Sequence, residues 1–155
     1  MAKRKGSKRG NRMDAIQLLK QDHQKAKKAF KQFEKMDHES ARARELAERT
    51  IADLKLHTAV EEEIFYPAVR EATDEEDLMN EAEVEHKSAK QLIQDLERMQ
   101  SSDPMYAATF TVLGEYIDHH VEEEEGEMFK KARKAKVDLR ALGEQIAARK
   151  AARGG

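Results

Sequence analysis

The sequence predicts an all-α protein: an up-down-up-down four-helix bundle with a short fifth helix near its C-terminal end. Three observations support this prediction. The 155 residues are 39% hydrophobic and 39% charged but only 5% aromatic, a balance typical of helical bundles. Two prolines and seven glycines leave long stretches without helix breakers. In four of these stretches apolar residues recur at steps of three and four, the period of a helix packed on one face.

Composition and charge limit the classes of function. The chain has no cysteine, which excludes disulfides and thiolate metal sites and fits a cytoplasmic location. A net charge of -2 argues against specific nucleic-acid binding, and no apolar run reaches the length of a membrane span. Residues 1–12 hold six basic and no acidic side chains. We expect a disordered tail there, which either stays solvated or contacts anionic surfaces nonspecifically.

The domain itself is expected over residues 13–148, followed by a second disordered tail at residues 149–155. Its first helix should cover residues 13–36 and its second residues 40–71, with Pro67 kinking or loosening the last turn of the second. The inward positions of these two helices are Ile16, Leu19, His23, Ala26, Phe30 and Phe33, then Ala43, Leu46, Thr50, Leu54, His57, Glu61, Ile64 and Ala68.

The third helix is expected to open at Thr73, in a capping box, and to end near Gln100. The fourth should cover residues 104–134, with Asp103 as its cap and Pro104 in its first helical position. A short fifth helix follows from about Val137. The inward positions are Met79, Ala82, His86, Ala89, Ile93 and Leu96, then Tyr106, Phe110, Leu113, Ile117, His120, Glu124 and Met128.

Six inward positions carry a histidine or a glutamate, and each of the four long helices supplies one histidine. An imidazole or carboxylate in a helical core is costly unless something compensates it, and a metal ion compensates both. One core histidine alone is more often a hydrogen-bonded imidazole, but four of them with two carboxylates indicate a metal site. His119 is rotated off the stripe, although an error of one residue in register would exchange it with its neighbour. The candidate ligands are His23, His57, Glu61, His86, His120 and Glu124.

Ligand type and number favour a pair of ions. Imidazole with carboxylate suits iron, manganese or zinc, and six ligand side chains exceed the roughly four of a structural zinc site. If both glutamates bridge, the protein and one bridging oxygen supply about ten bonds, against about twelve for two six-coordinate irons. About two open positions remain, where oxygen, nitric oxide or peroxide would bind.

Four sequence elements carry a resemblance to a known family. They are the stretch ending at His23, the His57–Glu61 motif followed by Ile-Phe-Tyr-Pro, the Glu85-His86 pair, and the acidic stretch His119–Phe129. The repeated His-x-x-x-Glu followed by aromatics also hints at a duplicated helical hairpin. Over about residues 13–148 the chain resembles the hemerythrin-like family, the HHE cation-binding domain. The resemblance implies a non-haem di-iron centre with glutamate and hydroxo or oxo bridges.

One position departs from the oxygen-carrying hemerythrins. They have two histidines four residues apart on the third helix, whereas here His86 is followed at that spacing by Lys90. A protonated ammonium does not ligate a cation, so the departure disfavours simple oxygen carriage and favours sensing or stress protection through a redox change. An enzyme that reduces peroxide or oxidises iron, a protein that stores or buffers iron, and a metal-free structural bundle remain as alternatives. The expected partners are a small diatomic ligand or peroxide, and the sequence names no partner protein.

Further polar residues surround the candidate ligands. His38 is expected in a surface turn. The tyrosines Tyr66, Tyr106 and Tyr116 are expected in the core, where one of them could hydrogen-bond to a ligand. A set of glutamates is interpreted as a solvated acidic face, or as a route by which iron enters or an alternate ligand; these are Glu62, Glu63, Glu122, Glu123 and Glu125.

Overall fold

The computed structural model describes residues 13–100 and 102–154 of the chain, and every regular element in these ranges is helical. The all-α class is therefore confirmed. The basic tail expected at residues 1–12 lies outside the described residues. None of the helices in the described ranges has the length and apolar content that crossing a membrane requires.

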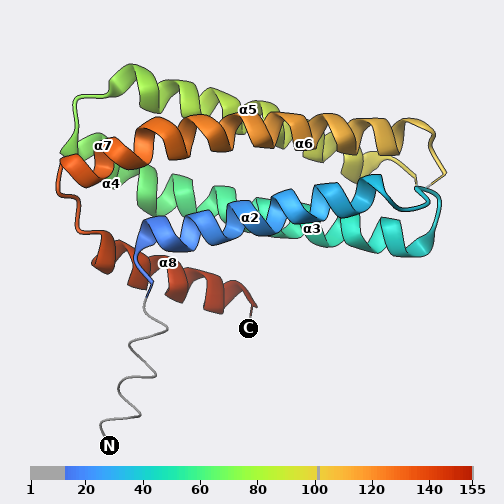
Figure 1. Cartoon of the computed structure of the whole chain (residues 1–155), viewed down its shortest axis with the longest axis horizontal. Coiled ribbons are helices and arrows are strands. Elements are labelled where there is room, and N and C mark those ends of the chain that lie inside the picture. Colours follow the sequence, from blue (N-terminus) through green and yellow to red (C-terminus); the bar gives the residue numbers. More distant parts are fainter. Residues whose placement is uncertain (1–12, 101, 155) are drawn as a thin grey trace, which may run out of the picture.

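Four long helical segments lie side by side, and a separate helix lies below one end of them (Figure 1). The loops from α2 to α3 and from α5 to α6 lie at one end, and the connection from α4 to α5 lies at the other. The elements are α2 (Ala15–Glu34), α3 (Ala41–Val60), η1 (Glu61–Phe65), α4 (Tyr66–Ala72), α5 (Glu76–Arg98), α6 (Met105–Glu123), η2 (Glu124–Met128), α7 (Phe129–Lys134) and α8 (Leu139–Gly154).

Side-chain caps fix the starts of α2 and α3. Asp14 and Gln17 form a reciprocal capping box at α2, and the Ser40 hydroxyl accepts the Ala43 N–H at α3. The capping box expected at Thr73 is wrong. That hydroxyl donates to the carbonyl of Val69 in the preceding helix, and α5 begins only at Glu76.

The second and fourth long segments each contain one π-helical turn, η1 and η2. Each turn begins at a glutamate of the candidate site, and its closing N–H bonds five residues back, from Tyr66 to Glu61 and from Phe129 to Glu124. Pro67 follows η1, but no proline lies near η2, so proline is not the common cause. The extra residue shifts the register of the helix that follows, and after η1 the Tyr66 hydroxyl reaches the Glu61 carboxylate. Such turns are frequent at functional sites.

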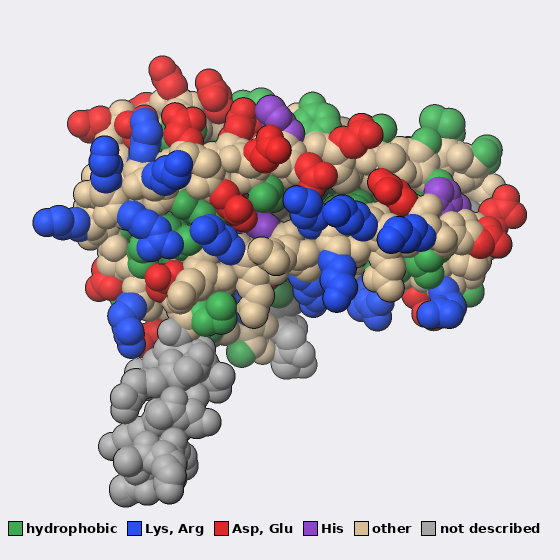
Figure 2. Space-filling model, in the orientation of Figure 1, with side chains coloured by type: hydrophobic (Ala, Val, Ile, Leu, Met, Phe, Trp, Pro, Cys, Tyr) green, Lys and Arg blue, Asp and Glu red, His purple; other side chains and the backbone are tan. Residues whose placement is uncertain are grey.

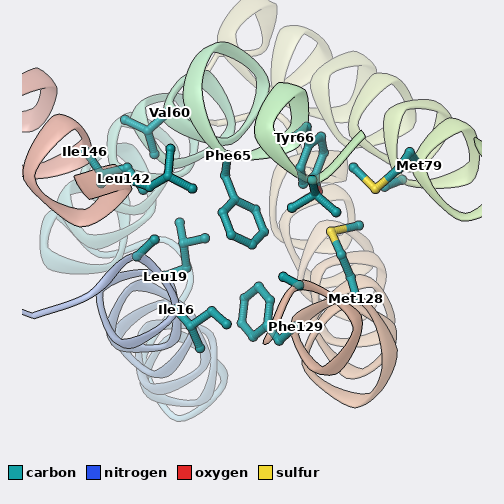
Figure 3. Packing of buried hydrophobic residues seen from close by; sticks show 14 residues of the cluster. Ile16, Leu19, Val60, Phe65, Tyr66, Met79, Met128, Phe129, Leu142 and Ile146 are labelled. Carbon is teal, nitrogen blue, oxygen red and sulfur yellow. The ribbon is translucent and has the colours of Figure 1, made fainter. Parts of the chain in front are cut away.

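Two buried apolar clusters fill the bundle, with the candidate ligands lying between them in sequence along each helix. One contains Phe65, Tyr66 and Phe129, and Figure 3 shows these rings between the helices with the side chains of α2 and α8 beside them. The other contains Phe33 and Phe110, whose ring centroids are 4.6 Å apart. Apolar packing on both sides holds the polar layer in place.

Helix α8 packs on α2 and, less extensively, on α3 and η1. Gly143 permits this close approach, because a Cβ there would lie 2.5 Å from the carbonyl oxygen of Met13. The disordered tail expected from residue 149 is wrong as far as Gly154, since α8 continues to that residue. Ion pairs from Arg149 to Glu63 and from Lys150 to Asp22 fasten this part of the helix.

Candidate metal centre

The six candidate ligands converge inside the bundle as two groups of four. One contains His23 and His57 and the other His86 and His120, and both contain Glu61 and Glu124. Within each group one ligand atom of every residue lies within 4.8 Å of the others. All six side chains are buried, with both glutamates at most 1% exposed. The structure thus brings together every residue that the sequence nominated, from four different helical segments.

Each glutamate directs one oxygen toward each group. Glu61 Oε2 lies 3.2 Å from His57 Nε2, and its Oε1 lies 2.9 Å from His86 Nε2. Glu124 Oε1 lies 3.0 Å from His23 Nε2, and its Oε2 lies 3.4 Å from His120 Nε2. A carboxylate oriented in this way can bind two cations at once.

The far nitrogen of each of the four candidate histidines meets a carboxylate. Nδ1 of His57 lies 2.8 Å from Asp22, and Nδ1 of His86 lies 2.8 Å from Glu62. The remaining two pairs are His23 with Glu125 and His120 with Glu85. An ionised carboxylate only accepts hydrogen bonds, so Nδ1 carries a proton and Nε2 is the nitrogen left to bind a metal ion at the centre. Such outer carboxylates orient metal-binding imidazoles and raise their basicity.

Tyr66 places a hydroxyl inside the second group. The phenol donates to Glu124 Oε2 at 2.6 Å, and its oxygen lies 3.1 and 3.2 Å from Nε2 of His86 and His120. Burial, then the charges of Glu124 and Glu61, hold the pKa of this phenol well above its usual value of 10.0. It therefore stays a proton donor in the metal-free protein, and a cation in this group would favour its deprotonation.

Four buried atoms of the first group have no hydrogen-bond partner among the described residues. They are Nε2 of His23 and His57, Oε2 of Glu61 and Oε1 of Glu124. The ring nitrogens lie near the carboxylate oxygens, but the geometry of a hydrogen bond is not met. Buried polar atoms are rarely left unpaired, and each one costs about 1–3 kcal/mol. A cation bonded to all four would remove that cost, so the residues present fit a metal ion.

Protonation of the histidines offers the metal-free protein a partial substitute. Burial by itself would lower the pKa of His57, but Glu61 and Asp22 outweigh it and raise the pKa to about 10. Burial likewise opposes the charge on His120, whose pKa rises to about 10 beside Glu124, Glu61 and Glu85. Burial would raise the pKa of Glu61, but the neighbouring histidines hold it well below 4.5. Protons and metal ions therefore compete for the same atoms.

The structure resolves three choices that concern single residues. The side chain of His119 is 63% exposed and that of His120 only 9%, as the stripe of α6 predicts. His38 is exposed and stacks on Phe33, away from the centre. Lys90 lies outside the groups, because its Nζ bonds Glu62 at 2.7 Å and its side chain is 48% exposed.

The prediction that all three tyrosines are core residues is wrong for Tyr116, which is 42% exposed at the surface of α6.

The centre repeats one pattern at an interval of 63 positions. This interval separates His23 from His86 and His57 from His120. It also separates Glu61 from Glu124. The outer carboxylates show the same interval, which separates Asp22 from Glu85 and Glu62 from Glu125. Each hairpin therefore supplies two histidines, one shared glutamate and the same arrangement of outer acids. At the aromatic position the pattern breaks, with Tyr66 in one hairpin and Phe129 in the other.

Comparison with known proteins agrees with this geometry. The family model described as the hemerythrin HHE cation binding domain matches residues 14–132. The chain belongs to this family. A crystal structure of a hemerythrin HHE cation binding domain-containing protein from Mycobacterium kansasii is similar, with a TM-score of 0.76 and 26% sequence identity. The match covers 88% of this chain and 85% of that protein. No curated protein matches the chain.

Sequence reasoning missed two features of this HHE centre. Two of the outer carboxylates, Glu62 and Glu125, were interpreted as part of a solvated face, and the other two, Asp22 and Glu85, were given no role of their own. Each of the four directly precedes or follows a candidate ligand in the chain, and that adjacency is the signal. Tyr66 was one of three equivalent aromatic candidates. Its place under Glu61 depends on the π turn of η1, because an α-helical register would have brought residue 65 there instead.

Proposed function

We propose that this HHE domain is a non-haem di-iron protein. It binds oxygen, nitric oxide or peroxide for sensing or for protection against oxidative and nitrosative stress, in the cytoplasm. The two irons are held in a bundle whose four long segments alternate in direction, and iron supplies the redox chemistry once it is bound. The proposed ligands are His23, His57, Glu61, His86, His120 and Glu124.

The observation that carries the proposal is the orientation of the two glutamates. Each places one oxygen near the His23 and His57 pair and the other near the His86 and His120 pair. One ion in the first group would use the four unpartnered atoms and leave the other oxygen of each glutamate directed at His86 and His120, whereas two ions use both oxygens of both glutamates. Imidazole and carboxylate ligands in this proportion suit iron.

Tyr66 makes the two positions chemically different. The first pair has four protein ligands, and the phenol oxygen can serve as a fifth beside His86 and His120. The protein thus leaves more room for an external ligand at the first ion. At the second ion it provides a group that can release or return a proton at the phenol oxygen.

That phenol also favours a second candidate function, an enzyme that reduces peroxide. Reduction of peroxide consumes protons, and a donor 2.6 Å from Glu124 is well placed to deliver one into the centre. Steady consumption of peroxide in the presence of a reductant would support this reading. Stoichiometric reaction without turnover would support binding and sensing.

The test is iron per chain together with the visible spectrum, before and after reduction and after exposure to oxygen or nitric oxide. We expect two irons per chain and a spectrum that changes with both the oxidation state and the added ligand. Fewer than one iron per chain after reconstitution under anaerobic conditions would contradict the proposal. More than two tightly bound irons per chain would favour storage.

A further inference from the structure

A cavity of about 640 Å³ opens beside the histidines, toward the cluster that contains Phe33 and Phe110. His57, His86 and His120 line it at the metal centre. Its deep walls include Ala26, Leu46 and Ala89, none more than 9% exposed.

The size of the cavity exceeds what a diatomic molecule or peroxide needs. A cavity of about 150 Å³ is enough to hold benzene. Pockets of roughly 300–1,000 Å³ are those that bind organic molecules of the size of a cofactor or drug. The space beside the centre therefore suits an organic ligand.

The deep part of the cavity offers little to a polar ligand. Two threonines line it, but their hydroxyls already donate to backbone carbonyls, Thr50 to Leu46 and Thr58 to Leu54. Apart from the histidines, the buried walls are methyl and methylene groups. A hydrocarbon chain buries its surface there without leaving a polar group unpaired.

The rim has a different chemistry. Three acids line the cavity, and each has a partner. Asp53 lies 3.3 Å from Lys25, Asp22 pairs with Lys150, and Glu85 bonds Nδ1 of His120. Lys28 and Arg49 also line the cavity and are exposed, and neither forms an ion pair with any described side chain. Figure 2 shows basic side chains gathered over α2, the helix that carries Lys28. The rim therefore complements a ligand with an anionic end.

We propose that this cavity binds a fatty carboxylate of medium or long chain. The hydrocarbon lies along the apolar walls toward the histidines, and the carboxylate lies at the rim with Lys28 and Arg49. The inference deepens the proposed function, on which it rests for the nature of the centre that the chain approaches. It gives this centre an organic ligand in addition to small oxidants.

The test is calorimetric titration of the iron-loaded protein with decanoate and, separately, decanol, each below the concentration at which it forms micelles. We expect one decanoate to bind per chain. The affinity for decanol should be lower by about tenfold or more, because decanol lacks the charge. Equal affinity for the two would overturn the role of the rim. No saturable binding of decanoate would overturn the whole proposal.

Variants separate the walls from the rim. Ala89→Leu fills part of the cavity, and Ala29→Leu does the same from a half-buried position, where a larger side chain disturbs the fold less. Either variant should lower the affinity for decanoate by about tenfold or more. The double variant Lys28→Glu with Arg49→Glu should lower the affinity for decanoate and leave the affinity for decanol unchanged. Its matched control carries Lys27→Glu and Arg42→Glu, exposed positions of the same helices outside the cavity, and should bind as the parent does.

Iron content is measured in every sample, which keeps the two proposals apart. Normal iron without decanoate binding contradicts only the cavity proposal. Decanoate binding by a protein that takes up no iron contradicts only the proposed function. Wild-type affinity in a folded Ala29→Leu or Ala89→Leu variant would show that decanoate binds elsewhere and would overturn the proposal.

Discussion

The half of the centre with His23 and His57 and the half with His86 and His120 follow one plan and differ at the aromatic position. In the second half Tyr66 stacks near His86, with ring centroids 5.1 Å apart, and its hydroxyl meets both histidines. In the first half Phe129 stacks near His23, with centroids 5.9 Å apart, and offers no polar group. The unpartnered atoms of the centre all lie in this half.

The coverings of the two halves differ as well. Helix α8 lies over the first half, where Lys150 pairs with Asp22. The corresponding acid of the second half, Glu85, instead lies in a surface group with His119 and Glu123. The repeated plan thus sets where two cations would bind, and the differences make the two positions inequivalent.

The largest expected effect comes from a shared glutamate. Glu61→Ala should remove most of both irons, because the carboxylate faces both groups, whereas His57→Ala should mainly deplete its own half. We expect affinity to fall by at least about a hundredfold, beyond the ten- to hundredfold typical of outer partners. Elemental analysis after gel filtration measures the iron. His38→Ala is the control, and equal iron in all three variants would refute the site assignment.

Removal of an outer carboxylate should have the next largest effect. Asp22→Asn in one half and Glu85→Gln in the other should each weaken metal binding by about ten- to hundredfold, since each leaves its histidine less firmly oriented. Titration with zinc or cobalt measures the affinity of the two metal positions separately if the variant lowers the affinity of only one of them. A uniform loss at both positions in either variant would contradict the division into halves.

The pH dependence should include one proton from each half. Because His57 and His120 have pKa values raised to about 10, their pairing stabilises the metal-free fold fully below pH 6.5 and is lost as pH rises through 10. The pKa of Glu61 is lowered, so its carboxylate stabilises the metal-free fold fully above pH 4.5. This stabilisation is lost as the pH falls through the pKa of Glu61 in the folded state.

Metal ions must displace these protons, so their affinity should rise by about tenfold per pH unit for each proton released. Zinc affinity measured from pH 6 to pH 9 checks the slope, and melting temperature of the metal-free protein checks the stability plateau. A flat affinity over that range would show that the histidines are already neutral.

Exchange of the aromatic residues tests the hydroxyl directly. In the metal-free protein Tyr66→Phe should cost about 1–3 kcal/mol, because Glu124 loses its buried donor, and calorimetry measures this loss. With ferric iron bound, the same variant should lose any phenolate absorption band. Addition of Phe129→Tyr should restore a band from the other half. An unchanged spectrum in Tyr66→Phe would exclude the phenol as a ligand.

The smallest effect is expected at Lys90. Its ammonium is half exposed and bonds Glu62, not the centre, and exposed ion pairs contribute little. Lys90→His should therefore change the autoxidation rate by less than about fivefold, as followed by the visible spectrum in air. A larger change would mean that the new imidazole reaches the His86 half, and that the departure from oxygen carriers matters more than its geometry indicates.

Much of the fold and the convergence of the six candidate ligands could be predicted from the sequence, because both depend on one helical period. His120 was distinguished from His119 by that period alone, and the exposures agree. The helix boundaries also follow local chemistry, as at Ser40, whose hydroxyl caps α3. Such features depend on residues within a few positions of one another.

The rest depends on competition between local bonds or on contacts distant in sequence. Thr73 has the spacing of a capping residue, but a carbonyl of the preceding helix competes for its hydroxyl. Arg149 looks like the start of a tail until Glu63, far away in the chain, is placed beside it. The π turns shift the register by one residue, and nothing in an unbroken helical pattern reveals that shift.

The unequal packing of the bundle has a consequence for the metal-free chain. Helices α2 and α3 pack closely on each other, as do α5 and α6, whereas α3 and α5 share far fewer contacts. Each group of ligands nevertheless draws on both hairpins, since Glu124 joins the first pair of histidines and Glu61 joins the second. Without cations the seam between the hairpins should open before either hairpin does. Amide hydrogen exchange around Glu61 and Glu124 would then report loss of iron earlier than global melting does.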